Sequence, residues 1–161
     1  MIYQIDQSGK IEDTHKLTII ASANSKTKVL KISATEKQTL VNQMREIEFP
    51  RKTYIYKIFA GLVFLLLKNY KNIDAVIIDK EYPSHEPDIK LFIIQLFKRT
   101  NKNCPEISFG HIGKQSKAHK VALAAFRGEI KPDFIVKKED LLRLFYTKRK
   151  GWRSRSDRDN P

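Results

Sequence analysis

Acidic side chains follow two separate strand-like segments of this chain. Asp6 comes at the end of an opening apolar segment, with Ser8 and Gly9 two and three residues after it. Asp79 and Glu81 come at the end of a second apolar segment, far downstream. Carboxylates at strand ends stand at the rim of a sheet, where α/β proteins tend to bind ligands. In a very basic chain, they predict a metal-ion site that acts on phosphate.

Hydrolysis of a phosphodiester explains why such side chains would be gathered. The reaction needs an activated water and a stabilised leaving oxygen, and two divalent cations about 3.5–4 Å apart can provide both. Carboxylates are hard oxygen ligands and favour Mg²⁺ or Mn²⁺ as these two ions. Asp6 and Asp79 can share these ions only if their carboxylates lie within about 8 Å of each other. The expected metal ligands are Asp6, Asp79, Glu81 and Glu86.

The charge balance points to a polyanionic partner. The chain has 31 Lys and Arg against 18 Asp and Glu, a formal net charge of +13. Such an excess attracts nucleic acid or an anionic membrane. Cations gather around His119 and, with one tryptophan, in a C-terminal tail that is expected to be flexible. The expected nucleic-acid-binding residues are Lys57, Lys114, Lys117, Lys120, Lys148, Arg149, Lys150, Trp152 and Arg153.

Length and composition limit the number of domains and argue against disulfide-linked, zinc-binding and membrane-spanning proteins. A chain of 161 residues predicts one domain over residues 1–147, followed by the tail at 148–161. Cys104 is the only cysteine, which excludes an intrachain disulfide and a multi-cysteine zinc site. The apolar run at residues 58–67 is shorter than the roughly 20 residues that span a bilayer, so it predicts a buried helix. Met1 leads straight into a strand-like segment, so we expect no signal peptide, no membrane partner and a cytoplasmic location.

The elements that must position these side chains follow from apolar periodicity and turn residues. Strands are predicted at 2–6, 15–23 and 28–32, joined by tight turns into an antiparallel meander. Strands at 73–79 and 106–111 then alternate with helices, and the first of them reads as a central strand covered on both faces. This order predicts an α/β fold with a mixed five-stranded sheet and helices on both faces. Helices are predicted at 35–48, 53–70, 87–99, 114–127 and 138–147.

This order, with Asp6 on the first strand and Asp79 ending the fourth, resembles the ribonuclease H-like superfamily. That superfamily includes RNase H, RuvC-type Holliday-junction resolvases, transposases and the nuclease domain of Argonaute. The resemblance covers roughly residues 1–128. It implies that Asp6 binds both metal ions and that Asp79 or Glu81 is the second shared ligand. It also implies that His119, on the last helix of the alternation, is a ligand or a proton-transfer group.

The chain departs from this pattern on its first long helix. Many members of the superfamily carry a Glu there, but residues 53–70 contain no acid, and the equivalent zone holds Tyr56, Lys57 and Ile58. Resolvase-like members carry their Glu at the end of the fourth strand, a role that Glu81 or Glu86 could fill. Lys57 could instead contact phosphate.

Three functions remain open. The first is a metal-dependent nuclease that cuts DNA or RNA, with Asp6, Asp79, Glu81 and His119 as its catalytic residues. The second is a catalytically inactive nucleic-acid-binding module of the same fold, with Lys57 in place of a metal ligand. The third is a small assembly protein on ribonucleoprotein that uses charge alone. A dimer is compatible with each of them.

Overall fold

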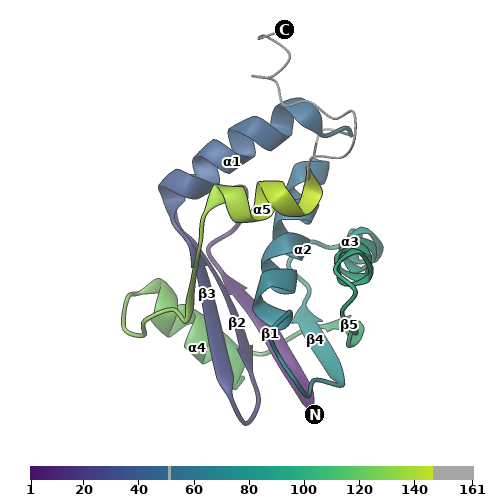
Figure 1. Ribbon diagram of the computed structural model, residues 1–161. Coiled ribbons are helices and arrows are strands. Elements are labelled where there is room, and N and C mark those ends of the chain that lie inside the picture. The colour runs from purple at the N-terminus through teal and green to yellow at the C-terminus, as the bar shows by residue number, and fades with distance from the viewer. Residues whose placement is uncertain (51, 147–161) are drawn as a thin grey trace, which may run out of the picture.

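The computed structural model describes residues 1–50 and 52–146. Within these residues, six strands form one mixed sheet in the order β5-β4-β1-β2-β3-β6. Consecutive strands β1 (Ile2–Ser8), β2 (Thr18–Ala23) and β3 (Thr27–Ile32) pair antiparallel, which confirms the predicted meander. On the other side of β1, β4 (Ala75–Asp79) and then β5 (Glu106–Gly110) are added in parallel. Figure 1 shows this arrangement.

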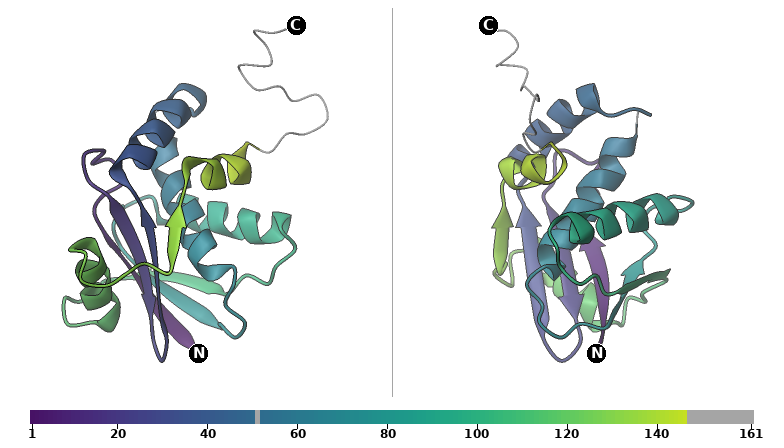
Figure 2. Two further views of the ribbon diagram at one scale, coloured as in Figure 1. Left: turned by 60° about the vertical axis from the view of Figure 1, so that its left-hand side comes forward. Right: turned by 45° about the vertical axis from the view of Figure 1, so that its right-hand side comes forward.

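Helices cover both faces of the sheet, as predicted. One face carries α4 (Lys117–Phe126), which packs across β1, β2 and β3. The other carries the main core, built around α2 (Thr53–Leu67) with α1 (Ala34–Ile47), α3 (Glu86–Arg99) and α5 (Lys138–Phe145) outside it. The left view of Figure 2 shows α4 alone on one side of the strands and the other helices on the opposite side.

The predicted count of five strands is wrong, because residues 134–136 form a sixth strand. β6 (Phe134–Val136) pairs in parallel with β3 and covers its outer edge. Asp133 fixes this register: its backbone N–H donates to the Val29 carbonyl at 2.8 Å, and its carboxylate accepts from the Val29 N–H at 2.7 Å. Three residues after a proline are too few to show the alternation of a strand, so only the pairing partner reveals it.

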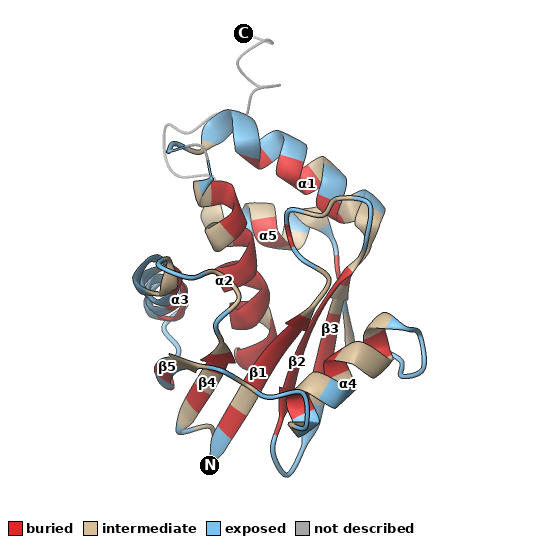
Figure 3. Ribbon diagram, turned by 180° about the vertical axis from the view of Figure 1, so that it is seen from behind, coloured by how far each residue is buried: buried red, intermediate tan, exposed pale blue. Residues whose placement is uncertain are grey.

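The strand that is buried on both faces is β2. The prediction that β4 is covered on both faces is wrong. All six residues of β2 are buried, whereas Ala75, Ile77 and Asp79 of β4 are only half-buried. The apolar run of β4 therefore overstates its cover, because α4 packs over β1, β2 and β3. Figure 3, seen from the α4 side, shows the buried β1 and β2 beside the more open β4.

The apolar run at residues 58–67 lies inside α2, and nearly every one of these side chains is buried in the main core. This confirms the predicted buried helix. Among the described residues, no helix combines the length and the hydropathy needed to cross a bilayer.

Gly9 is required by the turn that follows Asp6. Its φ is +82°, and a Cβ at this position would lie 2.2 Å from the Leu17 carbonyl oxygen. The turn cannot move away easily, since the Gly9 carbonyl accepts from the Thr18 hydroxyl and the neighbouring Lys10 carbonyl accepts from buried Lys37. Both the left-handed backbone and the close approach therefore exclude a side chain here.

We expect Gly9→Ala to lower the free energy of unfolding by roughly 3 kcal/mol or more, measured by urea denaturation. Gly128→Ala is the matched control, because Gly128 has a φ of +80° and nothing within 4 Å of an added Cβ. That variant carries only the left-handed backbone cost of about 1–2 kcal/mol. If both variants lost the same free energy of unfolding, the close approach to the Leu17 carbonyl would not contribute to the cost of Gly9→Ala.

Candidate metal centre

The pairing of β1 with β4 brings Asp6 and Asp79 to the same place. Ile5 pairs with Ile78 in parallel, so the next residue of each strand lies at the same level of the sheet. Side chains alternate between faces along a strand. Ile5 and Ile78 point into the main core, and both carboxylates therefore point to the face that carries α4.

Glu81 completes a cluster of three carboxylates. The chain turns immediately after β4, where the Glu81 N–H donates to the Asp79 carbonyl at 2.9 Å. One oxygen of each of Asp6, Asp79 and Glu81 lies within 4.8 Å of the other two. The predicted limit of about 8 Å is satisfied, so these three side chains could hold a divalent cation between them.

His119 reaches the same cluster from α4. Its Nδ1 lies 2.9 Å from Oδ2 of Asp6, and their side chains are 31% and 2% exposed. Ser116 places the histidine, because its hydroxyl accepts from the His119 N–H at 3.1 Å and caps the helix. This cap also explains why α4 begins at Lys117 and not at the predicted Lys114. With Nδ1–H donating to Asp6, the Nε2 atom of the ring remains for a proton or a ligand.

Backbone amides hold two of the carboxylates in place. The Gln7 N–H donates to Oδ1 of Asp6 at 2.8 Å. The Ile112 N–H donates to Oδ1 of Asp79 at 2.7 Å, from the loop that leaves β5. Neutral donors orient a carboxylate but bring no full positive charge. The two amides therefore order Asp6 and Asp79 without adding a full positive charge.

The pKa values of two of these acids are raised, mainly by burial. Burial raises the pKa of Asp6, although the hydrogen bonds from Gln7 and His119 oppose the shift. Burial also raises the pKa of Glu81 to about 8, helped by its hydrogen bond to Asp79 and by the charges of Asp79 and Asp6. Lys10 counters this shift, and it is a contributor that the sequence did not single out. A bound cation would lower these pKa values and allow all three carboxylates to ionise together. The cluster is therefore suited to binding a cation.

Two predicted site residues lie away from the three carboxylates that cluster. Lys57 is half-buried and pairs with Glu48 at 2.6 Å, with the rings of Phe92, Phe145 and Tyr146 around its ammonium group. Glu86 begins α3 and is not a member of the clustered group. The structure therefore brings Asp6, Asp79, Glu81 and His119 together, whereas Lys57 pairs with Glu48 and Glu86 is not part of the group of three carboxylates.

The predicted basic residues divide into two sets. Lys114, Lys117 and Lys120 are exposed around the first turn of α4, beside His119, and Lys117 donates to the Asn24 carbonyl at 3.2 Å. Lys148, Arg149, Lys150, Trp152 and Arg153 lie outside the described residues.

Comparison with known proteins adds no assignment: no protein-family model, no curated protein and no solved structure matches this chain.

Proposed function

We propose that this protein is a metal-dependent nuclease with a ribonuclease H-like fold. The order of its elements supports the fold: an antiparallel three-stranded meander is followed by two strands that add in parallel beside β1. The proposal is also supported by Asp6 on β1, Asp79 at the end of β4 and His119 on α4, the residues that the resemblance implies as ligands or proton-transfer groups. The sixth strand extends the sheet at the far edge, away from these residues.

The observation that carries the proposal is the cluster of Asp6, Asp79 and Glu81, with oxygens within 4.8 Å of one another. The donor set fits Mg²⁺ or Mn²⁺, because it consists of carboxylate oxygens without sulfur. A divalent cation supplies positive charge at the phosphodiester and at the water that attacks it. The excess of basic residues, +13 overall, supports a nucleic acid as the molecule that brings the phosphodiester.

The residues of the chain have separable roles in this proposal. Asp6, Asp79 and Glu81 hold the metal, and the Ile112 N–H orients Asp79. His119 orients Asp6 through Nδ1 and offers Nε2 to move a proton. Exposed lysines at the start of α4 contact phosphates on either side of the bond that is cut.

The inactive binding module is the second candidate. It is favoured by the absence of any acid in α2, where many superfamily members carry a metal ligand. The ion pair between Lys57 and Glu48 weakens one part of this alternative, since Lys57 already has a partner away from the carboxylate cluster.

A substrate panel tests the choice between them. We expect cleavage of at least one of single-stranded, duplex, hybrid or branched substrates in Mg²⁺ or Mn²⁺, and none in EDTA, because the proposed chemistry needs the cation. Gel analysis of end-labelled substrates provides the measurement. Binding to these substrates without metal-dependent cleavage of any of them would favour the inactive module.

A further inference from the structure

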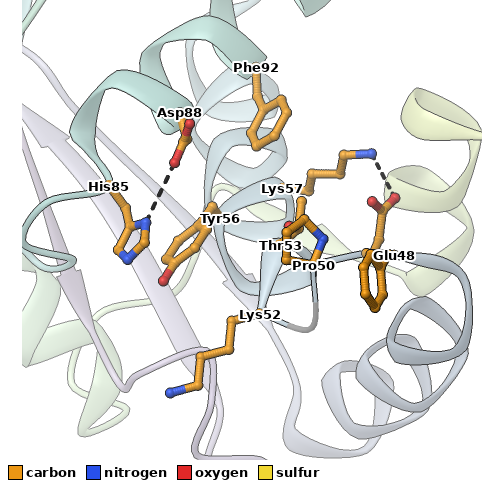
Figure 4. A pocket seen from close by; sticks show the side chains of 10 residues that line it. Glu48, Pro50, Lys52, Thr53, Tyr56, Lys57, His85, Asp88 and Phe92 are labelled. Carbon is orange, nitrogen blue, oxygen red and sulfur yellow. Dashed lines mark hydrogen bonds and ion pairs between the residues drawn. The ribbon is translucent and has the colours of Figure 1, made fainter.

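A hollow of about 580 Å³ lies between the first turns of α2 and α3 and the segment that follows α1. Rings form much of its wall. Figure 4 shows Tyr56 and His85 next to each other on one side of the hollow, with Lys57 and Glu48 on the other side. The roles proposed above for the carboxylate cluster use none of these side chains.

Two of the rings form a stack that reaches solvent. The centroids of Tyr56 and His85 are 4.0 Å apart, and their planes are inclined by 17°. Tyr82 packs edge-on against Tyr56 and supports it from the core. The His85 side chain remains 40% exposed, and Phe49, which also lines the hollow, is 90% exposed. A further flat ring can therefore extend this aromatic surface.

The charges of the hollow are nearly balanced. Lys57 pairs with Glu48 at 2.6 Å, and His85 lies 3.5 Å from Asp88. Lys52 adds one exposed cation, without an ion pair to any described residue. A surface of this kind suits a flat, weakly charged group with a phosphate near one edge. It does not suit a run of phosphates, which would need an excess of cations.

The loop after β4 links the carboxylate cluster, which faces α4, to the hollow between α2 and α3 on the other side of the sheet. Glu81 contributes to the cluster, and His85, four residues later, lines the hollow. Their Cα atoms are at most about 14 Å apart, the length of four extended residues. Tyr82, between them, accepts from Gln7, the neighbour of Asp6. At about 3.4 Å per nucleotide in one strand of a duplex, a few nucleotides cover this distance.

We propose that the hollow binds an unpaired nucleobase, which stacks on His85 and Phe49 a few nucleotides from the bond held at the carboxylates. The substrate class is then a nucleic acid with unpaired nucleotides beside the cleavage site, and not a continuous duplex. The inference rests on the nucleic-acid binding in the proposed function, but not on cleavage. A base in a duplex is already stacked and paired, so it must leave the helix to reach the rings, at a cost of a few kcal/mol.

Binding by single-stranded oligonucleotides tests the inference without any catalysis. The probe is an oligonucleotide with 2-aminopurine at successive positions, in EDTA, because its fluorescence falls when the base stacks on a ring. We expect quenching at one or two positions, and about 10-fold weaker binding by His85→Ala and by Phe49→Ala. His85→Phe should retain the affinity, since it keeps a ring. A blunt duplex should bind more weakly than the single strand.

Salt dependence separates stacking from charge. Loss of a stacking ring should lower the affinity equally at every NaCl concentration. Lys114→Ala should instead reduce the slope of log affinity against log salt by about 0.7 for a single strand. Leu91→Ala is the matched control, an exposed apolar side chain of α3 (52% exposed) that does not line the hollow. His85 is half-buried and the other substituted positions are exposed, and thermal melting confirms that each variant is folded.

The outcomes are distinct. Unchanged single-strand affinity in His85→Ala and Phe49→Ala would overturn the inference, as expected if the hollow takes a peptide segment. Equal affinity for single strand and blunt duplex would also overturn it. Position-specific quenching in a protein that cuts none of the substrates would support the unpaired-base site and refute the nuclease.

Discussion

Asp6→Asn is expected to lower metal-dependent cleavage by on the order of 10³-fold while leaving the affinity for nucleic acid nearly unchanged. Asp6 is 3% exposed and faces Asp79 and Glu81, so the amide removes charge where the cation would bind. The amide keeps the size of the carboxylate and can still accept from the Gln7 N–H. Single-turnover cleavage in Mg²⁺ and Mn²⁺ measures the loss, and fluorescence anisotropy in EDTA measures the affinity.

Glu106→Gln is the control for Asp6→Asn. Glu106 is an exposed acid at the start of β5, at the opposite end of the parallel strands from Asp79. Its variant removes the same charge from the same sheet and should cut at the parent rate. A loss of activity equal to that of Asp6→Asn would mean that overall charge, and not the cluster, governs cleavage. An active Asp6→Asn protein would refute the proposed centre.

The second large effect concerns stability and pH. The pKa of Glu81 is raised from its ordinary value of 4.5 to about 8, mainly by burial and then by Asp79. Between these values the folded state holds a proton that the unfolded state has lost. The free energy of unfolding therefore falls as the pH rises from about 4.5 to about 8, and the loss is complete above that range.

Glu81→Gln should remove this loss, because the amide has no proton to release. Above pH 8, without metal, we expect the variant to be more stable than the parent by on the order of 2 kcal/mol. At pH 4 the two should be nearly equal. Urea denaturation across this pH range, with the difference between the two proteins plotted, isolates Glu81 from other titrating groups.

Added Mn²⁺ provides a second readout that does not depend on cleavage. At pH 8 it should raise the melting temperature of the parent, since a bound cation compensates the three carboxylates and stabilises the folded state. It should raise that of Glu81→Gln much less. Glu129→Gln, at an exposed position after α4, should behave as the parent in both experiments. Parallel stability curves for the parent and Glu81→Gln would contradict the assignment of the raised pKa.

Local patterns in the sequence were sufficient to predict most of the helices and strands. Alternation along β1 places Ile5 in the core and Asp6 on the opposite face. The prediction that the strand ends at Asp6 is wrong, because pairing with β2 continues to Ser8 and Asp6 is buried within the strand. The apolar stripe of α2 predicts a helix buried in the core, because its period matches 3.6 residues per turn. Predicted ends differ from the observed ones by a few residues, as at α4, where the Ser116 cap sets the start.

The candidate site was only partly visible in the sequence. Asp6, Asp79, Glu81 and His119 were all expected, on the grounds of strand ends and a resemblance, and the structure places them together. Lys57 was expected near this site, but Glu48 and three rings hold it elsewhere. The type of a residue indicates what it can do, but its partner depends on how distant segments pack.

Composition, periodicity and turn residues by themselves determined that this chain forms an α/β sheet with an excess of basic residues and with carboxylates on its first and fourth strands. These properties depend on residues near one another in the sequence, or on totals over the chain. The tertiary structure decided the rest: the register of Ile5 with Ile78, the approach of His119 to Asp6, the sixth strand, and the ring stack of Tyr56 and His85. Each of these joins segments separated by long stretches of chain, and the pairing energy that selects them leaves no local pattern.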